Sequence, residues 1–409
     1  MSRKQIVRRL LLVIFFAAVF GAVASITFLA VKSLLVKENG SEDTDLVELS
    51  DGETILSSEE EETLAESTEQ VLTPEPVVIR ESKALEPEDY QELQNKLYEI
   101  GKQADFYIVT VTGVSSDTDW FDTPYEKKGQ GSGIIITNTG TELLVAVPER
   151  VISNAEQISV TFCNDAVVAA ALKEYDANTG LAVVSIPIET IPKETLDSVR
   201  VAELGNTVGI ARGSVVIAVG SPLGTNYSIL TGNVTSINNE VATIDKMLHV
   251  LTTDIVASAE GSGVLLNTEG KIIGFIMQDY ALDGSENTLT AVSVSQIREV
   301  LESLSNGKAV PYLGLHLSTV TEQLAKEHEI PTGAYIISVE MDSPAMQAGL
   351  QSGDVISSMN GQKITSIYDY EKILRESAPQ DVISIVVERM GAESVYTELE
   401  YTATVGVLR

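Results

Sequence analysis

Short runs of apolar residues, separated by turn residues, recur along most of the chain. From Phe106 onward these runs are rich in Val, Ile and Thr, the residues that β-strands favour. The intervening segments Asn138-Thr139-Gly140 and Asn267-Thr268-Glu269-Gly270 are typical of hairpin turns. Many short strands without alternating long helices predict an all-β sandwich or a pair of barrels. The predicted strands include Phe106–Thr112, Ile134–Thr137, Leu143–Val147, Ile158–Phe162, Leu181–Ile186, Val215–Val219 and Lys271–Met277.

Two helices are predicted at the borders of this β-rich region. The first begins at Pro87-Glu88-Asp89 and places Leu93, Leu97 and Ile100 on one stripe. The second covers Ser295–Leu304 and is followed by a short Ser-Asn-Gly-Lys linker. A third module then runs to the C-terminus.

The longest apolar run, Leu10–Val31, predicts a transmembrane helix. As a helix it would extend about 33 Å, enough to cross a hydrocarbon core of roughly 30 Å. Residues 1–9 contain the basic side chains, so the positive-inside rule places them in the cytoplasm and the rest of the chain outside. The alternative is a cleaved signal peptide, because Ala22-Val23-Ala24 resembles a cleavage site. The apolar continuation to Val31 favours a single-pass anchor in the cell membrane of a bacterium.

An acidic segment follows the apolar run. Between Glu38 and Glu69 there are acidic residues but no lysine or arginine. Low hydrophobicity with like charge cannot offset the entropy of ordering, so residues 32–87 are predicted to be a disordered linker. An acidic tail that binds calcium or a partner is the alternative.

Composition excludes several classes of function. The chain has 27 basic and 59 acidic residues, a formal net charge of -32, and lacks the basic stripe that nucleic-acid binding requires. The single cysteine, Cys163, excludes an intrachain disulfide and any multi-cysteine metal site. We therefore expect no metal, no cofactor and no nucleic-acid partner. Only three histidines are present, and they are His249, His316 and His328.

Five segments, in order, resemble the HtrA/DegP family, whose members are trypsin-like serine proteases with a C-terminal PDZ domain. The segments are Gly131–Ile136, Asn178–Val183, Val219–Gly224, Thr231–Thr235, and Thr253-Asp254 followed by Gly261-Ser262-Gly263. The resemblance implies a mostly β fold, in which a chymotrypsin/trypsin-like double β-barrel over residues 88–305 precedes an α+β PDZ domain over residues 310–403. A shared fold does not by itself establish activity, so the residues at the implied catalytic site decide it.

Two members of the implied catalytic triad are replaced. Ser262 stands at the nucleophile position, and a serine hydroxyl needs a neighbouring base to take its proton. The family's histidine falls on Arg150, which stays protonated and cannot accept a proton. The orienting aspartate falls on Gly180, which has no side chain. Asp176 matches an acid that the family carries in addition to the triad member.

The surroundings of Ser262 also depart from the family's pattern. Glu260 replaces the glycine whose N–H would belong to the oxyanion hole. His249 lies on a predicted strand of the second barrel, away from Arg150. Lys271 follows a hairpin glycine and is expected to be solvated. Ser262 is therefore predicted to be a vestigial nucleophile.

The third module resembles a PDZ domain of the kind that follows bacterial proteases. Its most specific strings are Ser343-Pro344-Ala345 and Ala348–Ile356. PDZ domains hold a peptide C-terminus by strand addition, with loop N–H groups on the carboxylate. The resemblance implies peptide-binding residues Tyr312, Leu313, Gly314, Leu315 and Leu317, whereas the leucines alone would equally suit a sheet core. His316 is expected on a strand face.

Two functions are compatible with these residues. The first is a membrane-anchored, catalytically inactive protein that binds peptide C-termini or partner proteins through its PDZ domain outside the cell. The alternative is an active HtrA-like serine endopeptidase of extracytoplasmic protein quality control. A homo-trimer, or co-assembly with an active relative, is a further expectation because proteases of this family form trimers.

Overall fold

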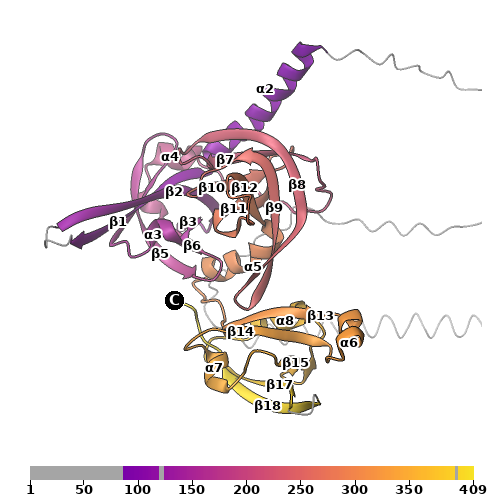
Figure 1. Cartoon of the computed structure of the whole chain (residues 1–409). Helices are drawn as coiled ribbons and strands as arrows, with labels where there is room; N and C mark the ends of the chain where they lie inside the picture. Colours follow the sequence, from indigo (N-terminus) through magenta and orange to yellow (C-terminus); the bar gives the residue numbers. More distant parts are fainter. Residues whose placement is uncertain (1–85, 119–123, 392–394) are drawn as a thin grey trace, which may run out of the picture. The chain divides into compact units, whose positions relative to one another are not determined.

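The computed structural model describes residues 86–118, 124–391 and 395–409 (Figure 1). The basic segment at 1–9, the helix expected at 10–31 and nearly all of the acidic linker lie outside these residues. Among the described residues, no helix combines the length and the apolar composition of a membrane span.

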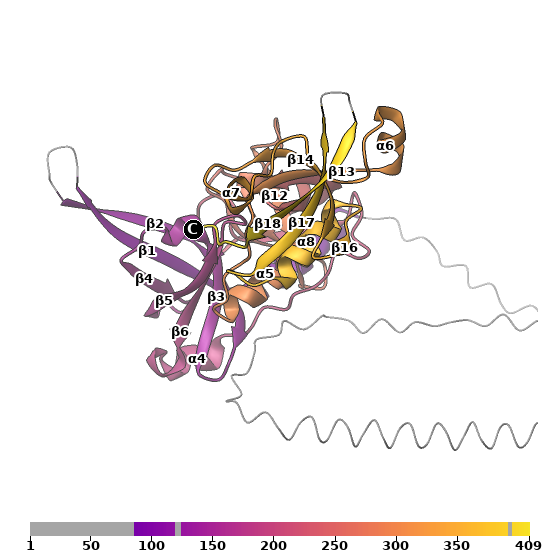
Figure 2. The same cartoon turned by 90° about the horizontal axis from the view of Figure 1, so that it is seen from below.

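The first barrel is closed by six antiparallel strands in the order β1-β2-β3-β6-β5-β4. The predicted turn at residues 138–140 joins β2 to β3, and β1 and β2 extend together beyond the rest of the barrel (Figure 2). Its strands are β1 (Ile108–Thr118), β2 (Pro124–Asn138), β3 (Glu142–Pro148), β4 (Gln157–Thr161), β5 (Val167–Asp176) and β6 (Leu181–Pro187).

The second barrel is closed in the order β10-β11-β12-β9-β8-β7. Its strands are β7 (Val215–Ser221), β8 (Ser228–Thr243), β9 (Lys246–Val256), β10 (Ser262–Leu266), β11 (Ile272–Ile276) and β12 (Thr288–Ser293). Strands β8 and β9 form a long hairpin whose last pair is Thr243 with Lys246. Ile244 and Asp245 alone make the turn, and Asp245 has a φ of 58°. An acidic residue tolerates this left-handed conformation better than a β-branched one does.

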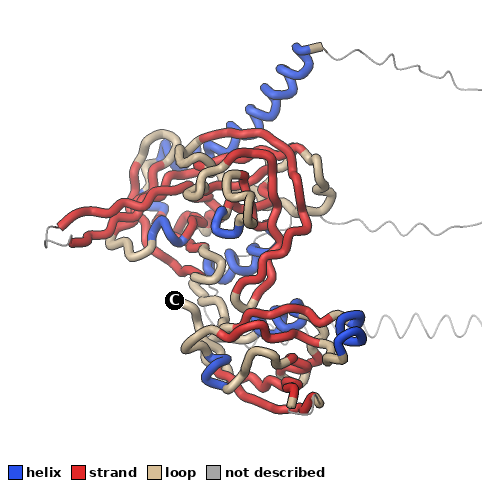
Figure 3. Tube along the Cα trace, viewed as in Figure 1, coloured by secondary structure: helices blue, strands red, loops and turns tan. Residues whose placement is uncertain are grey.

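Strands make up most of the barrel region, with helices between them and at its borders (Figure 3). The predicted first helix is confirmed as α2, where Leu97 is buried and Leu93 is half exposed. The second is confirmed as α5, whose apolar stripe faces the core. The run predicted from Phe106 begins instead with a 3-10 turn, since Tyr107 N–H donates to the Ala104 carbonyl. The elements are α2 (Pro87–Gln103), η1 (Ala104–Phe106), α3 (Glu149–Ile152), η2 (Ile188–Thr190), α4 (Lys193–Ser198), η3 (Gln278–Tyr280) and α5 (Val294–Ser305).

The third module is a sheet in the order β13-β14-β15-β17-β18, with β16 beside β15. Strand β13 is at the edge, where only β14 pairs with it. Ile367, Tyr370, Ile373 and Leu374 are buried along one face of α8. The elements are β13 (Leu315–Val320), α6 (Glu322–His328), β14 (Gly333–Val339), α7 (Pro344–Ala348), β15 (Val355–Met359), β16 (Gln362–Lys363), α8 (Ile367–Glu376), β17 (Val382–Met390) and β18 (Tyr396–Thr404).

The observed elements confirm the predicted fold class, a double β-barrel followed by an α+β module. The first barrel and part of the second share one hydrophobic core, and the third module has its own. The two barrels and the third module contact one another and belong to one compact unit.

Candidate active-site cleft and carboxylate-binding loop

Ser262 is the first residue of β10, and its side chain is completely buried. Its Oγ accepts a hydrogen bond from the Ser132 N–H at 3.0 Å. The following Gly263 has a φ of 123°, and a Cβ there would lie 2.1 Å from the Val219 carbonyl oxygen. The tight glycine turn therefore seats the hydroxyl against β2, enclosed by protein. A nucleophile has to reach its substrate, and in this conformation the hydroxyl is closed off.

Arg150 lies on α3, directly after β3, and reaches the loop before Ser262. Its Nη2 donates to the carbonyl oxygens of Glu260 at 3.1 Å and Gly261 at 2.9 Å. Its Nη1 is 3.3 Å from a carboxylate oxygen of Asp279. Its Nε is 3.7 Å from the carboxylate of Glu260, so the two residues pair, a point that the sequence alone left open. The guanidinium thus ties α3 to the loop directly before Ser262.

Gly180 stands between β5 and β6 with a φ of 68°. Its carbonyl oxygen accepts from the Glu149 N–H at 2.8 Å, beside Arg150. The structure therefore joins Gly180 to the start of α3, and Arg150 of the same helix to the residue before Ser262. Asp176 is buried in its own turn, where its carboxylate accepts from Thr179 N–H and from Thr179 Oγ1 at 2.7 Å. Its role is to hold the turn that presents Gly180.

The three histidines are engaged elsewhere. His249, on β9, has its Nε2 2.9 Å from the Tyr368 hydroxyl and stacks on that ring. His316 has its Nε2 2.8 Å from Glu340, and His328 ends α6 in an exposed position. Within the described residues, the hydrogen bonding of the Ser262 hydroxyl involves no imidazole.

The expectation that Lys271 is solvated is wrong. Its side chain is only 20% exposed, and its Nζ lies 3.7 Å from Glu203 and 3.5 Å from Glu269. The ammonium is therefore partly enclosed between two carboxylates rather than open to solvent.

A second contact closes the cleft from the opposite loop. The Tyr280 hydroxyl donates to the Asn178 carbonyl oxygen at 2.8 Å, joining η3 to the turn at residues 176–180. Burial raises the pKa of Tyr280, with the Asp176 and Asp279 carboxylates adding to the effect, so it stays a neutral donor. Together with Arg150, it links the two barrels across the cleft.

The second candidate site is the loop before β13, where three backbone N–H groups converge. Leu313 and Gly314 donate to Asp245 Oδ2 at 2.7 and 2.8 Å, and Leu315 donates to Asp245 Oδ1 at 3.0 Å. Gly314 has a φ of 92°, and a Cβ there would lie 2.3 Å from Ser343 Cβ. Glycine is therefore required at this turn, and the loop holds the Asp245 carboxylate. That carboxylate belongs to the chain itself.

The side chains of the other predicted peptide-binding residues are mostly buried in the third module. Leu313, Leu315 and Leu317 are buried in the core of the third module, and Tyr312 is 9% exposed. The leucines therefore serve the sheet core, which was the competing interpretation. Asp245 was missed because nothing in a two-residue hairpin turn indicates which distant loop it will contact.

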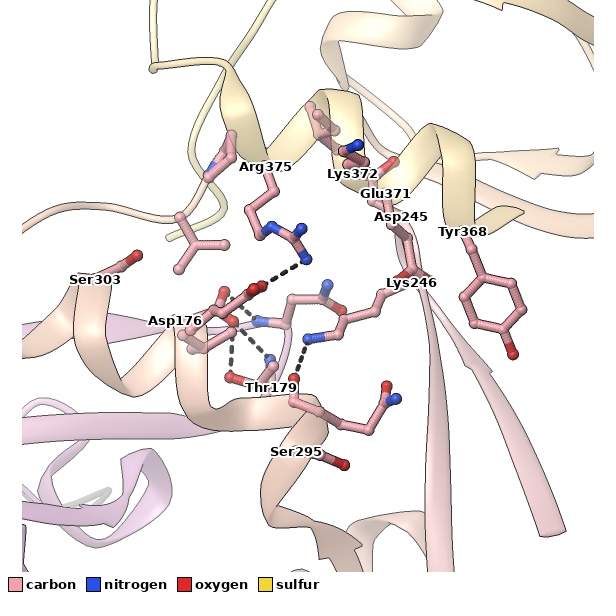
Figure 4. Close-up of a pocket in the computed structure, with 17 residues that line it drawn as sticks. Asp176, Thr179, Asp245, Lys246, Ser295, Ser303, Tyr368, Glu371, Lys372 and Arg375 are labelled. Atoms are coloured by element: carbon pink, nitrogen blue, oxygen red, sulfur yellow. Dashed lines mark hydrogen bonds and ion pairs between the residues drawn. The ribbon is translucent and has the colours of Figure 1, made fainter. Parts of the chain in front are cut away.

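A cavity of about 390 Å³ lies beside Asp245, between the hairpin turn, α5 and α8 (Figure 4). Lys246 Nζ donates to the Gln296 carbonyl oxygen at 2.8 Å, and Arg375 pairs with Glu299 at 2.5 Å. Burial lowers the pKa of Lys246, and the Glu371 carboxylate opposes that shift. In the part of the chain that the structure describes, no group of His, Cys, Asp and Glu side chains is arranged to hold a metal ion.

Two domain families match the chain. Residues 131–275 match the trypsin-like peptidase domain, and residues 335–389 match the PDZ domain. The putative serine protease HhoB of Synechocystis sp. is 30% identical over 280 residues, which cover 64% of this chain and 64% of the relative. The serine protease Do-like HtrA of Bacillus subtilis is 28% identical over 301 residues, covering 69% of this chain and 65% of the relative. The chain spans about three fifths of the length of the curated relatives it matches.

Solved structures show the same fold. The HtrA-type protease AlgW with a decapeptide aligns with a TM-score of 0.54 at 21% identity, covering 76% of this chain and 99% of that one. The serine endoprotease from Yersinia pestis aligns with a TM-score of 0.51 at 22% identity, covering 76% and 98%. At this level of identity the similarity concerns the fold, and the chemistry depends on the residues in place.

Proposed function

We propose that this HtrA-type protein, whose trypsin-like peptidase domain is followed by a PDZ domain, does not hydrolyse peptide bonds and acts by binding peptide or protein C-termini. The observation that carries the first half is the position of Arg150. Its guanidinium occupies the place of the general base and binds the two carbonyl groups before Ser262.

Proton transfer is the step that the cleft does not support. Attack by a serine hydroxyl requires an acceptor within about 3.2 Å, and Arg150 has only donors. Gly180 has no carboxylate to orient a base. In a serine protease, removing a triad member lowers turnover by roughly 10⁴- to 10⁶-fold. Replacing both base and orienter leaves no route for the proton.

Stabilisation of the tetrahedral intermediate is also unsupported. An oxyanion hole presents N–H donors to the developing negative charge. Here the carbonyl oxygens of Glu260 and Gly261 are directed at Arg150, and the Gly261 N–H donates to the Ser258 carbonyl at 2.8 Å. The Glu260 carboxylate adds a negative charge beside the same loop.

Labelling with a fluorophosphonate probe tests this part of the proposal. We expect the native chain to give no adduct, as Ser262→Ala does, while trypsin labelled in parallel gives a stable one. An adduct on Ser262 that disappears in Ser262→Ala would show that the chain is an active serine endopeptidase, the competing function.

The binding half of the proposal rests on the loop at residues 312–315. Its N–H groups already hold a carboxylate, the group that ends every unmodified peptide. A labelled peptide with a free C-terminus, compared with the same peptide ending in an amide, measures this activity. Equal affinity for the free-acid and the amidated peptide would refute recognition of the C-terminus.

We further propose that the folded part lies outside the cytoplasm, anchored by residues 10–31. The support is the basic segment before the apolar run, together with a relative from Hahella chejuensis that is named a probable periplasmic serine endoprotease. Intact mass of the chain purified from membranes distinguishes a retained anchor from a cleaved signal peptide. Native mass of the same preparation determines whether it forms trimers.

A further inference from the structure

The Asp245 carboxylate lies where a bound C-terminal carboxylate would lie in the loop before β13. Both of its oxygens are used: Oδ2 accepts from two backbone N–H groups, and Oδ1 accepts from Leu315 N–H and from the Tyr370 hydroxyl at 2.5 Å. Burial raises the pKa of Asp245, and the four hydrogen bonds oppose that shift. Because a neutral acid would replace one of these acceptor positions with a donor, the geometry fits a carboxylate that accepts from all four groups. Asp245 is 5% exposed, and Tyr370 is completely buried.

The backbone of the turn also forms a hydrogen bond of the kind that strand addition uses, between a main-chain N–H and the edge strand. Asp245 N–H donates to the Leu315 carbonyl oxygen at 2.6 Å, on the open side of the edge strand β13. A peptide that adds to a sheet edge makes this same pair of contacts, a carboxylate on the loop and an N–H on the first strand residue. The hairpin makes them without a chain end.

Neighbouring contacts hold the turn in that position. Met247 packs against the core of the third module, and its N–H donates to Glu371 Oε1 on α8 at 2.6 Å. Asn178 donates to the Ile244 carbonyl from the barrel side. Further along β9, His249 bonds the Tyr368 hydroxyl of α8. Because α8 and β13 are both contacted, the turn fills the region next to the loop as well as the loop itself.

From this geometry we propose that Asp245 is an internal ligand of the carboxylate-binding loop, and that a free peptide C-terminus binds there only by displacing the turn at residues 243–246. The second clause rests on the proposed peptide-binding function; the first does not. One loop cannot hold two carboxylates at once, since its three N–H groups are already committed. The apparent affinity for any peptide therefore equals the intrinsic affinity of the open loop multiplied by the fraction of molecules in which the turn is displaced.

Hydrogen exchange tests the internal ligand without any peptide. In the full-length native chain we expect the amides of Leu313, Gly314 and Leu315 to be protected. In Asp245→Asn, which keeps the shape of the side chain but turns an amide NH₂ toward these donors, their exchange should accelerate by about tenfold or more. Asp254→Asn is the matched control, since Asp254 is an exposed aspartate of β9, the strand that follows the turn, and bonds Asn233. The amides of β15 report whether each variant is folded.

Peptide binding tests the displacement. The probe is a fluorescein-labelled peptide ending in Leu-Val with a free carboxylate. We expect Asp245→Asn to bind it about tenfold more tightly than the native chain and Asp254→Asn to bind it as the native chain does. Equal affinity in Asp245→Asn and the native chain would overturn the displacement while leaving peptide binding intact. If no variant binds peptide, the proposed function fails, and the exchange experiment still decides whether Asp245 occupies the loop. Equal exchange at residues 313–315 in the native chain and Asp245→Asn would overturn the internal ligand.

Discussion

The Nη2 atom of Arg150 lies 2.9 Å from the carbonyl oxygen of Gly261, the residue directly before Ser262. A permanent cation therefore binds the backbone at the point where a serine protease presents N–H donors. In the proposed function the same guanidinium stands at the position of the general base, so one residue would both lack a proton acceptor and fix the neighbouring loop.

Removing the Arg150 side chain should destabilise the protein mainly through its lost hydrogen bonds to the loop, and less through its lost ion pairs. The partners Glu260 and Asp279 are 86% and 65% exposed, and exposed ion pairs contribute little. The hydrogen bonds to two backbone carbonyls are better shielded, so Arg150→Ala should lower the free energy of unfolding by about 1–2 kcal/mol. Urea denaturation measures it, with Arg212→Ala, an exposed arginine, as the control. Equal losses in the two variants would contradict the tether.

Two glycines of the third module share a φ of 92° but differ in surroundings. A Cβ on Gly353 meets nothing within 4 Å, whereas one on Gly314 meets Ser343 Cβ at 2.3 Å. Gly353→Ala should cost only the strain of a left-handed backbone, about 1 kcal/mol, and Gly314→Ala about 2 kcal/mol more from overpacking. Thermal denaturation of both variants checks the difference. Similar losses would mean that Ser343 moves aside.

The third module contains a buried ion pair whose disruption should be costly. Asp354 is 1% exposed and receives Arg389 Nε at 2.6 Å and Nη2 at 2.7 Å. The carboxylate raises the pKa of Arg389 and holds it charged. Asp354→Ala should destabilise the module by about 1–3 kcal/mol, because the partly exposed Arg389 guanidinium and the Gln351 N–H both lose this acceptor. Glu398→Ala, at an exposed position of β18, should stay within about 0.5 kcal/mol. A small effect at position 354 would mean that water replaces the carboxylate.

Stability should fall in alkaline solution because of buried tyrosines. Burial raises the pKa of Tyr312 to about 12, with the Asp245 and Glu340 carboxylates adding to it, and burial likewise raises the pKa of Tyr227 to about 12. A raised pKa means that the folded state keeps the proton longer than the unfolded state. The contribution is therefore complete below pH ~10 and is lost between pH ~10 and about 12.

Comparing the native chain with Tyr312→Phe isolates this effect. Lys246 acts in the opposite sense, because burial lowers its pKa and the unfolded chain holds that proton up to pH ~10.5. The lysine is common to both proteins, so their difference in unfolding free energy should be constant from pH 7 to 9. It should change above pH ~10, where only the native chain loses the Tyr312 contribution. A constant difference across the whole range would contradict the assignment.

Much of the fold could be predicted from local sequence. Strands rich in β-branched residues and turns such as Asn138-Thr139-Gly140 are set by short-range sterics, and the helices α2 and α5 follow from their apolar stripes. The order of residues also predicted Arg150 at the position of the base and Gly180 at that of the orienter, which stays a prediction. These features need no knowledge of which segments meet in space.

What the sequence by itself determined is therefore the order of the elements, since it depends on residue identity and local conformation. Tertiary structure alone decided that Arg150 binds the Glu260 and Gly261 carbonyls, that Lys271 is held between carboxylates, and that Asp245 enters the loop at Leu313–Leu315. Apart from the contact of Lys271 with its near neighbour Glu269, these contacts join residues far apart in the chain. Which residues meet depends on how the barrels close and on which buried N–H groups lack a backbone acceptor. Neither property produces a periodic or local pattern in the sequence.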